Sequence, residues 1–85
     1  MTIAYTKAFI KQAKKLSPQM RQQLKERLAY FSENPLNRIL RNHALNGRYK
    51  NYRSINITGD VRALYLQKEN EAIFDAIGTH SQLYK

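Results

Sequence analysis

The sequence contains no cysteine and no tryptophan, and its 85 residues include only two histidines, His43 and His80. Without cysteine, the chain has no disulfide framework, no thiolate metal site and no cysteine nucleophile. Two histidines and a few scattered carboxylates lack the spacing of metal ligands, so we expect no metal and no other cofactor. The three glycines are isolated, which excludes a phosphate-binding loop and a dinucleotide fingerprint.

Long apolar runs are also missing. The longest cover a few residues, whereas a helix that spans a bilayer needs about 20. The N-terminal segment lacks the continuous apolar stretch and the small-residue cleavage site of a signal peptide. We therefore expect a cytoplasmic protein that does not bind a membrane. The length and the 42% of hydrophobic residues predict a single domain over residues 1–85.

Acidic residues are scarce relative to basic ones. The chain has 15 Lys and Arg but 6 Asp and Glu, which gives a net charge of +9. The first 50 residues hold 11 basic and 2 acidic residues, whereas residues 51–85 hold 4 of each. This asymmetry favours a polyanionic partner such as nucleic acid, the ribosome or an acidic protein. A solvated basic surface that only keeps the domain soluble is the alternative interpretation.

Two helices are predicted in the basic half. Thr6 is a suitable N-cap, and apolar residues recur after it at helical spacing. Ser17-Pro18 ends this helix and begins the next, with the serine as cap and the proline at the first helical position. The second helix stops at Asn34-Pro35. We expect the two helices to form a hairpin whose apolar sides cover a sheet.

After residue 50, the hydrophobic period changes from about 3.6 residues to about 2. Three strands with short connections are predicted at 50–57, 61–67 and 72–79, and they favour an antiparallel meander. A short strand over 2–5 and a connector with one helical turn over 35–50 complete the order β-α-α-β-β-β. This order predicts an α+β fold, with the N-terminal strand and the helix hairpin packed on a small antiparallel sheet.

The polar side chains of the predicted strands and their flanks form a candidate site. They are His43, Arg53, Asn56, Asp60, Arg62, His80 and Tyr84. An imidazole titrates near neutral pH, a guanidinium donates two parallel hydrogen bonds to phosphate, and a phenol stacks on a base. Together these groups suit acid–base cleavage of a phosphodiester. Taken singly, each has a structural interpretation, such as a turn aspartate or a packed tyrosine.

Four segments are distinctive in their order: His43-Ala-Leu-Asn-Gly, Tyr52-Arg-Ser-Ile, Gly59-Asp-Val-Arg-Ala-Leu-Tyr65 and Ile77-Gly-Thr-His-Ser-Gln-Leu-Tyr84. They resemble the RelE/ParE superfamily of bacterial type II toxins, and its YafQ-type branch most closely. The order of helices and strands matches as well, so the resemblance covers nearly the whole chain. It implies a RelE-like fold and a metal-independent mRNA endonuclease that cuts codons in the ribosomal A site.

The resemblance also implies an active site. The catalytic positions of the YafQ type, carried over one by one, are His43, Asp60, His80 and Tyr84. A second histidine of the family is replaced by Asn56, whose amide can bind phosphate or ribose but cannot exchange a proton near pH 7. A strand arginine that contacts phosphate in the superfamily corresponds to Arg62. We expect Arg53 and Asn56 to bind the substrate together with Arg62.

In the implied reaction, the 2′-hydroxyl of the mRNA attacks the neighbouring phosphate and expels the 5′-oxygen of the next nucleotide. The products are a 2′,3′-cyclic phosphate and a 5′-hydroxyl. Our hypothesis makes His80 the acid and Asp60 the base or the residue that orients a histidine, with His43 assisting. Arg62 stabilises the phosphate charge, and Tyr84 stacks on a base. The acid and base roles are exchangeable at this point.

The partners implied by the resemblance are mRNA, the ribosome and an acidic antitoxin encoded beside the toxin. Operator DNA is bound only through the antitoxin complex. The net charge of +9 favours an acidic partner, because complementary charge speeds association. The basic residues of the two helices are predicted to bind the ribosome: Lys7, Lys11, Lys14, Lys15, Arg21, Lys25 and Arg27.

Two other functions stay open. A ParE-like toxin resembles the same fold but inhibits DNA gyrase, and Asp60 and His80 argue against it. A catalytically inactive basic binding module is the second, and Asn56 in place of a family histidine keeps it open. A gyrase inhibitor leaves mRNA intact and causes DNA damage. An inactive module binds an acidic partner without affecting growth.

Overall fold

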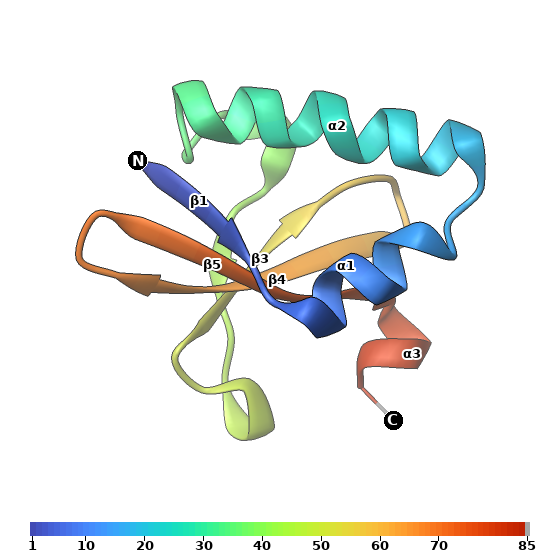
Figure 1. The fold of residues 1–85 in the computed structure, drawn as a ribbon. Helices are drawn as coiled ribbons and strands as arrows, with labels where there is room; N and C mark the ends of the chain where they lie inside the picture. The colour runs from blue at the N-terminus through green and yellow to red at the C-terminus, as the bar shows by residue number, and fades with distance from the viewer. Residues whose placement is uncertain (85) are drawn as a thin grey trace.

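The computed structural model describes residues 1–84 and has two layers, with the long helices on one face of a five-stranded sheet (Figure 1). The strands are β1 (Thr2–Tyr5), β2 (His43–Ala44), β3 (Tyr52–Asn56), β4 (Val61–Lys68) and β5 (Glu71–Thr79). The helices are α1 (Lys7–Lys14), α2 (Pro18–Glu33) and α3 (His80–Leu83), with 3-10 turns η1 (Arg38–Leu40) and η2 (Gly47–Tyr49). The strand order across the sheet is β1-β5-β4-β3-β2.

The predicted α+β class and the antiparallel meander of the last three strands are confirmed. The N-terminal strand forms one edge of the sheet and runs parallel to β5. The expected element order was wrong in omitting two elements. One is β2, which at two residues is too short to show an alternation, and the other is α3, a single turn directly after β5.

Side-chain caps begin both long helices where the sequence predicts them. Thr6 Oγ1 accepts a hydrogen bond from Phe9 N at 3.1 Å, and Ser17 Oγ accepts one from Met20 N at 3.2 Å. Each cap satisfies a backbone donor that lacks a partner within the helix. The second helix ends just before Asn34, as expected.

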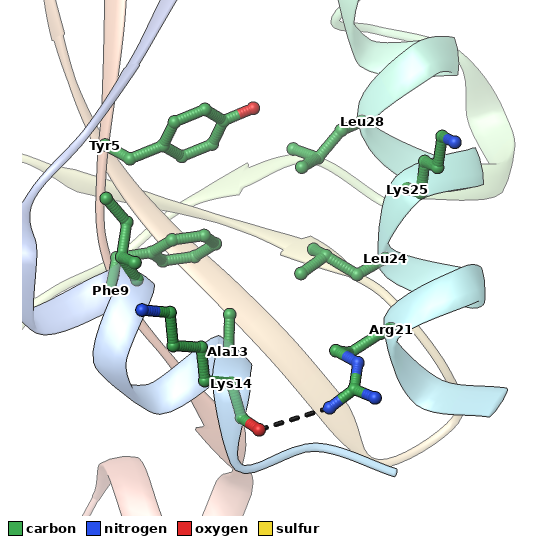
Figure 2. Close-up of a pocket in the computed structure, with 9 residues that line it drawn as sticks. Tyr5, Phe9, Ala13, Lys14, Arg21, Leu24, Lys25 and Leu28 are labelled. Atoms are coloured by element: carbon green, nitrogen blue, oxygen red, sulfur yellow. Dashed lines mark hydrogen bonds between the residues drawn. The ribbon is translucent and has the colours of Figure 1, made fainter. Parts of the chain in front are cut away.

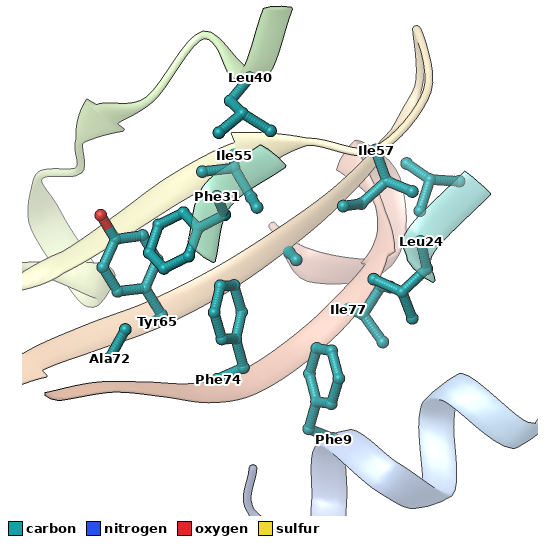
Figure 3. Packing of buried hydrophobic residues seen from close by; sticks show 12 residues of the cluster. Phe9, Leu24, Phe31, Leu40, Ile55, Ile57, Tyr65, Ala72, Phe74 and Ile77 are labelled. Atoms are coloured by element: carbon teal, nitrogen blue, oxygen red, sulfur yellow. The ribbon is translucent and has the colours of Figure 1, made fainter. Parts of the chain in front are cut away.

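The core fills the space between the helices and the sheet (Figure 3). Phe9 of α1 and Phe31 of α2 both pack on Phe74 of β5, with ring centroids 5.7 and 5.2 Å apart. Phe31 also lies edge-on to the buried Tyr65 at 5.0 Å. Burial of one such side chain contributes about 1.5–3 kcal/mol, so this aromatic cluster dominates the packing between the layers.

Strand alternation gives the sheet a second, different face. Ile55 of β3 belongs to the core, so its neighbours Ser54 and Asn56 point to the opposite side. Ser54 pairs with His43, and Asn56 pairs with Arg62. We call this side, which α1 and α2 leave uncovered, the open face. It carries most of the residues predicted to be functional.

Candidate functional site

Two of the predicted catalytic residues, His80 and Tyr84, lie at the start and at the C-cap of the short helix α3. Thr79 and Gln82 form a capping box: Thr79 Oγ1 accepts from Gln82 N at 3.2 Å, and Gln82 Oε1 accepts from Thr79 N at 2.8 Å. His80 and Tyr84 are four residues apart, which places their rings together with centroids 4.6 Å apart. Gly78 leaves room for the Gln82 side chain of the capping box, because a Cβ at Gly78 would lie 2.8 Å from Gln82 Oε1.

A row of aromatic rings continues from this pair towards β3. The ring of Tyr49 lies 5.5 Å from that of Tyr84 and 5.6 Å from that of Tyr52, edge-on in both cases. The Tyr49 hydroxyl donates to Leu83 O at 2.9 Å, and the Tyr52 hydroxyl donates to Asp75 Oδ2 at 2.7 Å. These bonds hold η2 against α3 and make the row a fixed part of the open face.

A β-bulge brings Asp75 into this row. Leu64 pairs with Ala76 and the next residue, Tyr65, pairs with Phe74, which leaves Asp75 without a partner strand residue. Sequence reasoning missed Asp75 and the two tyrosines of η2 and β3. No local pattern reveals them, because their hydrogen bonds join positions 23 and 34 residues apart.

Asn56 and Arg62 lie directly opposite each other on β3 and β4. The Arg62 guanidinium donates from Nη1 to the carbonyl oxygens of Gly59 and Asp60, at 3.5 and 3.4 Å. Burial raises the pKa of the Tyr84 phenol, and the nearby charge of Arg62 acts in the opposite direction. Tyr84 therefore stays protonated at neutral pH, which suits stacking and hydrogen bonding rather than proton abstraction.

Asp60 lies exposed in the β3–β4 turn. It directly precedes Val61, and Val61 pairs with Thr79, the residue before His80. The structure therefore places Asp60 and His80 at the same end of the sheet. The hydrogen bonds at Asp60 use its backbone groups, and its exposed carboxylate is accessible to a substrate.

His43 lies farther along the open face, on the edge strand β2. Its Nδ1–H donates to Arg41 O at 2.9 Å, which leaves Nε2 available to accept a proton. Three strand spacings, about 14 Å in total, separate the backbones of β2 and β5. His43 and His80 are therefore two separate points of the open face rather than a contacting pair.

Arg53 is not brought together with the other predicted residues. It alternates with Ser54 and pairs with the core residue Tyr65, so its side chain leaves on the helix side of the sheet. Arg53 Nε donates to Asn42 Oδ1 at 2.8 Å, and Asn42 Nδ2 donates to the Tyr65 hydroxyl at 2.7 Å. This network anchors the chain before β2 and gives Arg53 a structural role.

Within the predicted ribosome-binding set, Arg27 lies at a different pocket from Lys14, Arg21 and Lys25. Lys14, Arg21 and Lys25 border an apolar groove of about 350 Å³ between α1 and α2, which we call the α1–α2 groove (Figure 2). Arg21 Nη1 closes one end by donating to Lys14 O and Leu16 O, at 3.2 and 3.0 Å. Arg27 lies apart from them, half-buried in a second pocket beside the β3–β4 turn.

The described residues 1–84 contain no group of three or more histidines and carboxylates that could hold a metal ion. Within the same part of the chain, no helix has the length and apolar character needed to cross a membrane.

Comparison with known proteins gives a consistent result. The model of the family described as "Bacterial toxin of type II toxin-antitoxin system, YafQ" matches residues 1–85. The crystal structure of YafQ from Escherichia coli superposes with a TM-score of 0.80 at 26% identity, covering 98% of this chain and 97% of the other. YafQ in the E. coli DinJ-YafQ complex gives a TM-score of 0.76 at 26% identity, with the same coverage of 98% and 97%.

A third similar structure is HP0894 from Helicobacter pylori, described as a conserved hypothetical protein. Its TM-score is 0.73 at 27% identity, and 99% of each chain is covered. A search among curated proteins finds no match.

Proposed function

The chain belongs to the YafQ family of bacterial type II toxins, and from this premise we propose that it is a metal-independent endonuclease that cleaves mRNA on the ribosome. Its cognate partner is an acidic antitoxin. The proposal concerns the reaction and its substrate, which the family membership leaves open. The open face supplies the groups that the reaction needs.

The observation that carries the proposal is the ring contact between His80 and Tyr84, with Arg62 beside them. A nucleobase stacked on the Tyr84 ring places its adjacent phosphate next to the imidazole. Arg62 gains stronger hydrogen bonds by turning from backbone carbonyls to a charged phosphate. The three groups together bind a nucleotide, transfer a proton and stabilise the developing negative charge.

The position of Asp60 supports its role as the second proton-transfer group. It lies at the same end of the sheet as His80, and this placement favours contact of both residues with one phosphodiester. We assign His80 as the acid for the leaving 5′-oxygen and Asp60 as the base for the 2′-hydroxyl. Asn56 binds the substrate, and His43, with Nε2 available, assists farther along the RNA.

The test is cleavage of an mRNA by the purified protein, mapped by primer extension with and without programmed ribosomes. The variant His80→Ala is compared with Ser81→Ala, an exposed neighbour on the same turn that leaves the capping box intact. We expect A-site cuts only with ribosomes, unaffected by a chelator and by Ser81→Ala. Loss of general acid catalysis should lower the rate of His80→Ala by about 10²–10⁴-fold.

Other outcomes would replace the proposal. Cuts without ribosomes would keep the nuclease and remove the ribosome from the mechanism. Intact mRNA together with DNA damage in expressing cells would identify a gyrase inhibitor. Intact mRNA with normal growth would identify a basic binding module. Asn56, which replaces a family histidine, would then be the first residue to test as the cause of the lost activity.

The α1–α2 groove supports the antitoxin part of the proposal (Figure 2). Phe9, Leu24 and Leu28 form its apolar lining, and three cationic side chains border it. An amphipathic helix with acidic flanks complements both features, because its apolar side fills the groove and its carboxylates meet the cations. The partially exposed Ile10 on the groove wall is an anchor for such a helix.

Ile10→Asp and Leu36→Asp test this placement, because both replace an exposed apolar side chain but only Ile10 lines the groove. With the acidic protein encoded beside the toxin as the ligand, Ile10→Asp should weaken binding by about tenfold or more, since it replaces an apolar anchor with a carboxylate that the acidic flanks of the partner repel. Leu36→Asp should bind like the native toxin. Equal affinity of the two variants would place the antitoxin elsewhere.

A further inference from the structure

A second cationic pocket lies beside the open face, between α2, η1 and the β3–β4 turn. It has a volume of about 510 Å³. Three arginines from three different elements line it: Arg27 of α2, Arg41 just after η1, and Arg62 of β4. Asn56 and Gln23 contribute amide groups, and none of the residues that line the pocket is acidic. We call it the arginine pocket.

Three guanidinium groups around one pocket repel each other unless an anion lies between them. The guanidiniums of Arg27 and Arg41 form no hydrogen bond among the described residues, so their donors are free for a ligand. The bonds of Arg62 to two turn carbonyls, at 3.4 and 3.5 Å, lie at the long end of the hydrogen-bonding range and are readily exchanged. Phosphate oxygens match these forked donors in geometry and in charge.

The backbone of Arg41 adopts a conformation that is energetically unfavourable for residues other than glycine. Arg41 has φ of 48°, a left-handed conformation that is uncommon for residues other than glycine. Its backbone N–H donates to Arg38 O at 3.2 Å, and its carbonyl accepts from His43 Nδ1 at 2.9 Å. The backbone of Arg41 is thereby hydrogen-bonded directly to His43, a candidate catalytic residue.

The arginine pocket is distinct from the place where we expect the cleaved phosphate. Neither His80 nor Tyr84 lines it, and Arg62 is shared between the two places. Because Arg62 lies at the boundary, a backbone that passes the α3 end of the open face can continue into the pocket. The position of Arg27 separates it from the lysines with which it was grouped on sequence grounds.

We propose that the arginine pocket binds a phosphodiester group of single-stranded RNA other than the one that is cleaved. The identity of RNA as the ligand rests on the proposed nuclease function, whereas the affinity of the pocket for phosphate rests on its three arginines. Neither Arg27 nor Arg41 is among the substrate-binding residues predicted from the sequence. The two arginines position the RNA so that the neighbouring nucleotide reaches Tyr84.

The experiment measures the binding of a fluorescent 2′-O-methyl oligoribonucleotide, which cannot be cleaved through its 2′ position, by anisotropy over a salt series. Arg27→Gln and Arg41→Gln are compared with Arg38→Gln, an exposed arginine on η1 outside the pocket. Each pocket variant should weaken binding by about tenfold. Each should also reduce the slope of log K against log salt by about 0.7, since one phosphate contact is lost. Arg38→Gln should behave like the native protein.

A second arm, cosedimentation with ribosomes, distinguishes the two sources of RNA phosphate. Loss of oligonucleotide binding supports a site for mRNA, and loss of ribosome binding alone supports a site for ribosomal RNA. Variants that match Arg38→Gln in both arms, with melting temperatures equal to the native one, overturn the proposal. If the native protein binds RNA through the pocket but cleaves none, the pocket stands and the nuclease function fails.

Discussion

The two faces of the sheet come from the same strands but do different work. On the helix side, Ile55, Tyr65 and Phe74 are fully or almost fully buried and pack against α1 and α2. On the open face, Asn56 and Arg62 stay partly exposed between turns and a row of tyrosines. Because side chains alternate along each strand, a core residue and a residue of the open face are direct neighbours in the sequence.

The two faces should respond differently to substitutions. A side chain of the core fills space that nothing else can fill, so its loss lowers the free energy of unfolding. The open-face side chains that we propose for the reaction, such as Asn56 and Arg62, are partly exposed, so their loss should leave the fold intact. Substitutions on the two faces should therefore differ in their effects on stability and on RNA.

Phe74→Ala should have the largest effect. The ring contacts those of Phe9, Phe31 and Tyr65, and a large-to-small change at such a site costs about 3–5 kcal/mol. A domain of this size has a total stability of about 5–15 kcal/mol, so much of it should be lost. Chemical denaturation measures the change, and a loss below about 1 kcal/mol would mean that the core is not centred on this ring.

Tyr84→Ala should act mainly on the substrate. Loss of a stacking surface weakens RNA binding by about 1–3 kcal/mol, seen as a higher KM for cleavage at a temperature where the variant is fully folded. Tyr84→Phe keeps the ring and should retain near-native cleavage. A Tyr84→Phe variant as defective as Tyr84→Ala would assign the role to the hydroxyl instead of to stacking.

Tyr52→Phe should show that the open face also carries some stability, and that this part depends on pH. The hydrogen bond to Asp75, followed by burial, raises the pKa of Tyr52 above its ordinary value of 10.0. The neutral phenol is therefore favoured in the folded state, and its contribution, about 1 kcal/mol, is complete below pH 10 and lost as pH rises through the raised pKa. The gap in melting temperature between native and variant should be constant at pH 7–9 and shrink above pH 10.

Ser54→Ala should have the smallest effect and the opposite sign. Ser54 is fully buried on the strand that carries Asn56, and its Oγ has no hydrogen-bond partner. Because a buried hydroxyl without a partner is unfavourable, its removal should raise stability by up to about 1 kcal/mol. Thermal unfolding measures this, and a destabilised variant would reveal that the hydroxyl has a partner in solution.

Periodicity and caps determined most of the architecture. Thr6 and Ser17-Pro18 fix the helix starts because capping is a local interaction, and it needs no knowledge of the rest of the fold. The change to a period of two after residue 50 predicted β3, β4 and β5 for the same reason. The elements β2 and α3 lay below this signal, since two residues or one turn contain no full period.

For the candidate site, residues could be predicted from the sequence, but the side chains that they contact could not. Motif order pointed to His80 and Tyr84, and their spacing of four became a ring contact once α3 formed. Arg53 was placed with the substrate-binding residues, but the phase of the β3 alternation directs it to Asn42 on the other side of the sheet. That phase depends on which face the helices cover.

Charge, caps, periods and motifs are local features, and these could be predicted from stretches of a few residues. The long-range contacts depend on the tertiary structure. The bulge that turns Asp75 towards Tyr52 and the meeting of Arg27, Arg41 and Arg62 around one pocket both join distant parts of the chain. Such contacts follow from the register of strands and the packing of helices, which no short stretch of sequence contains.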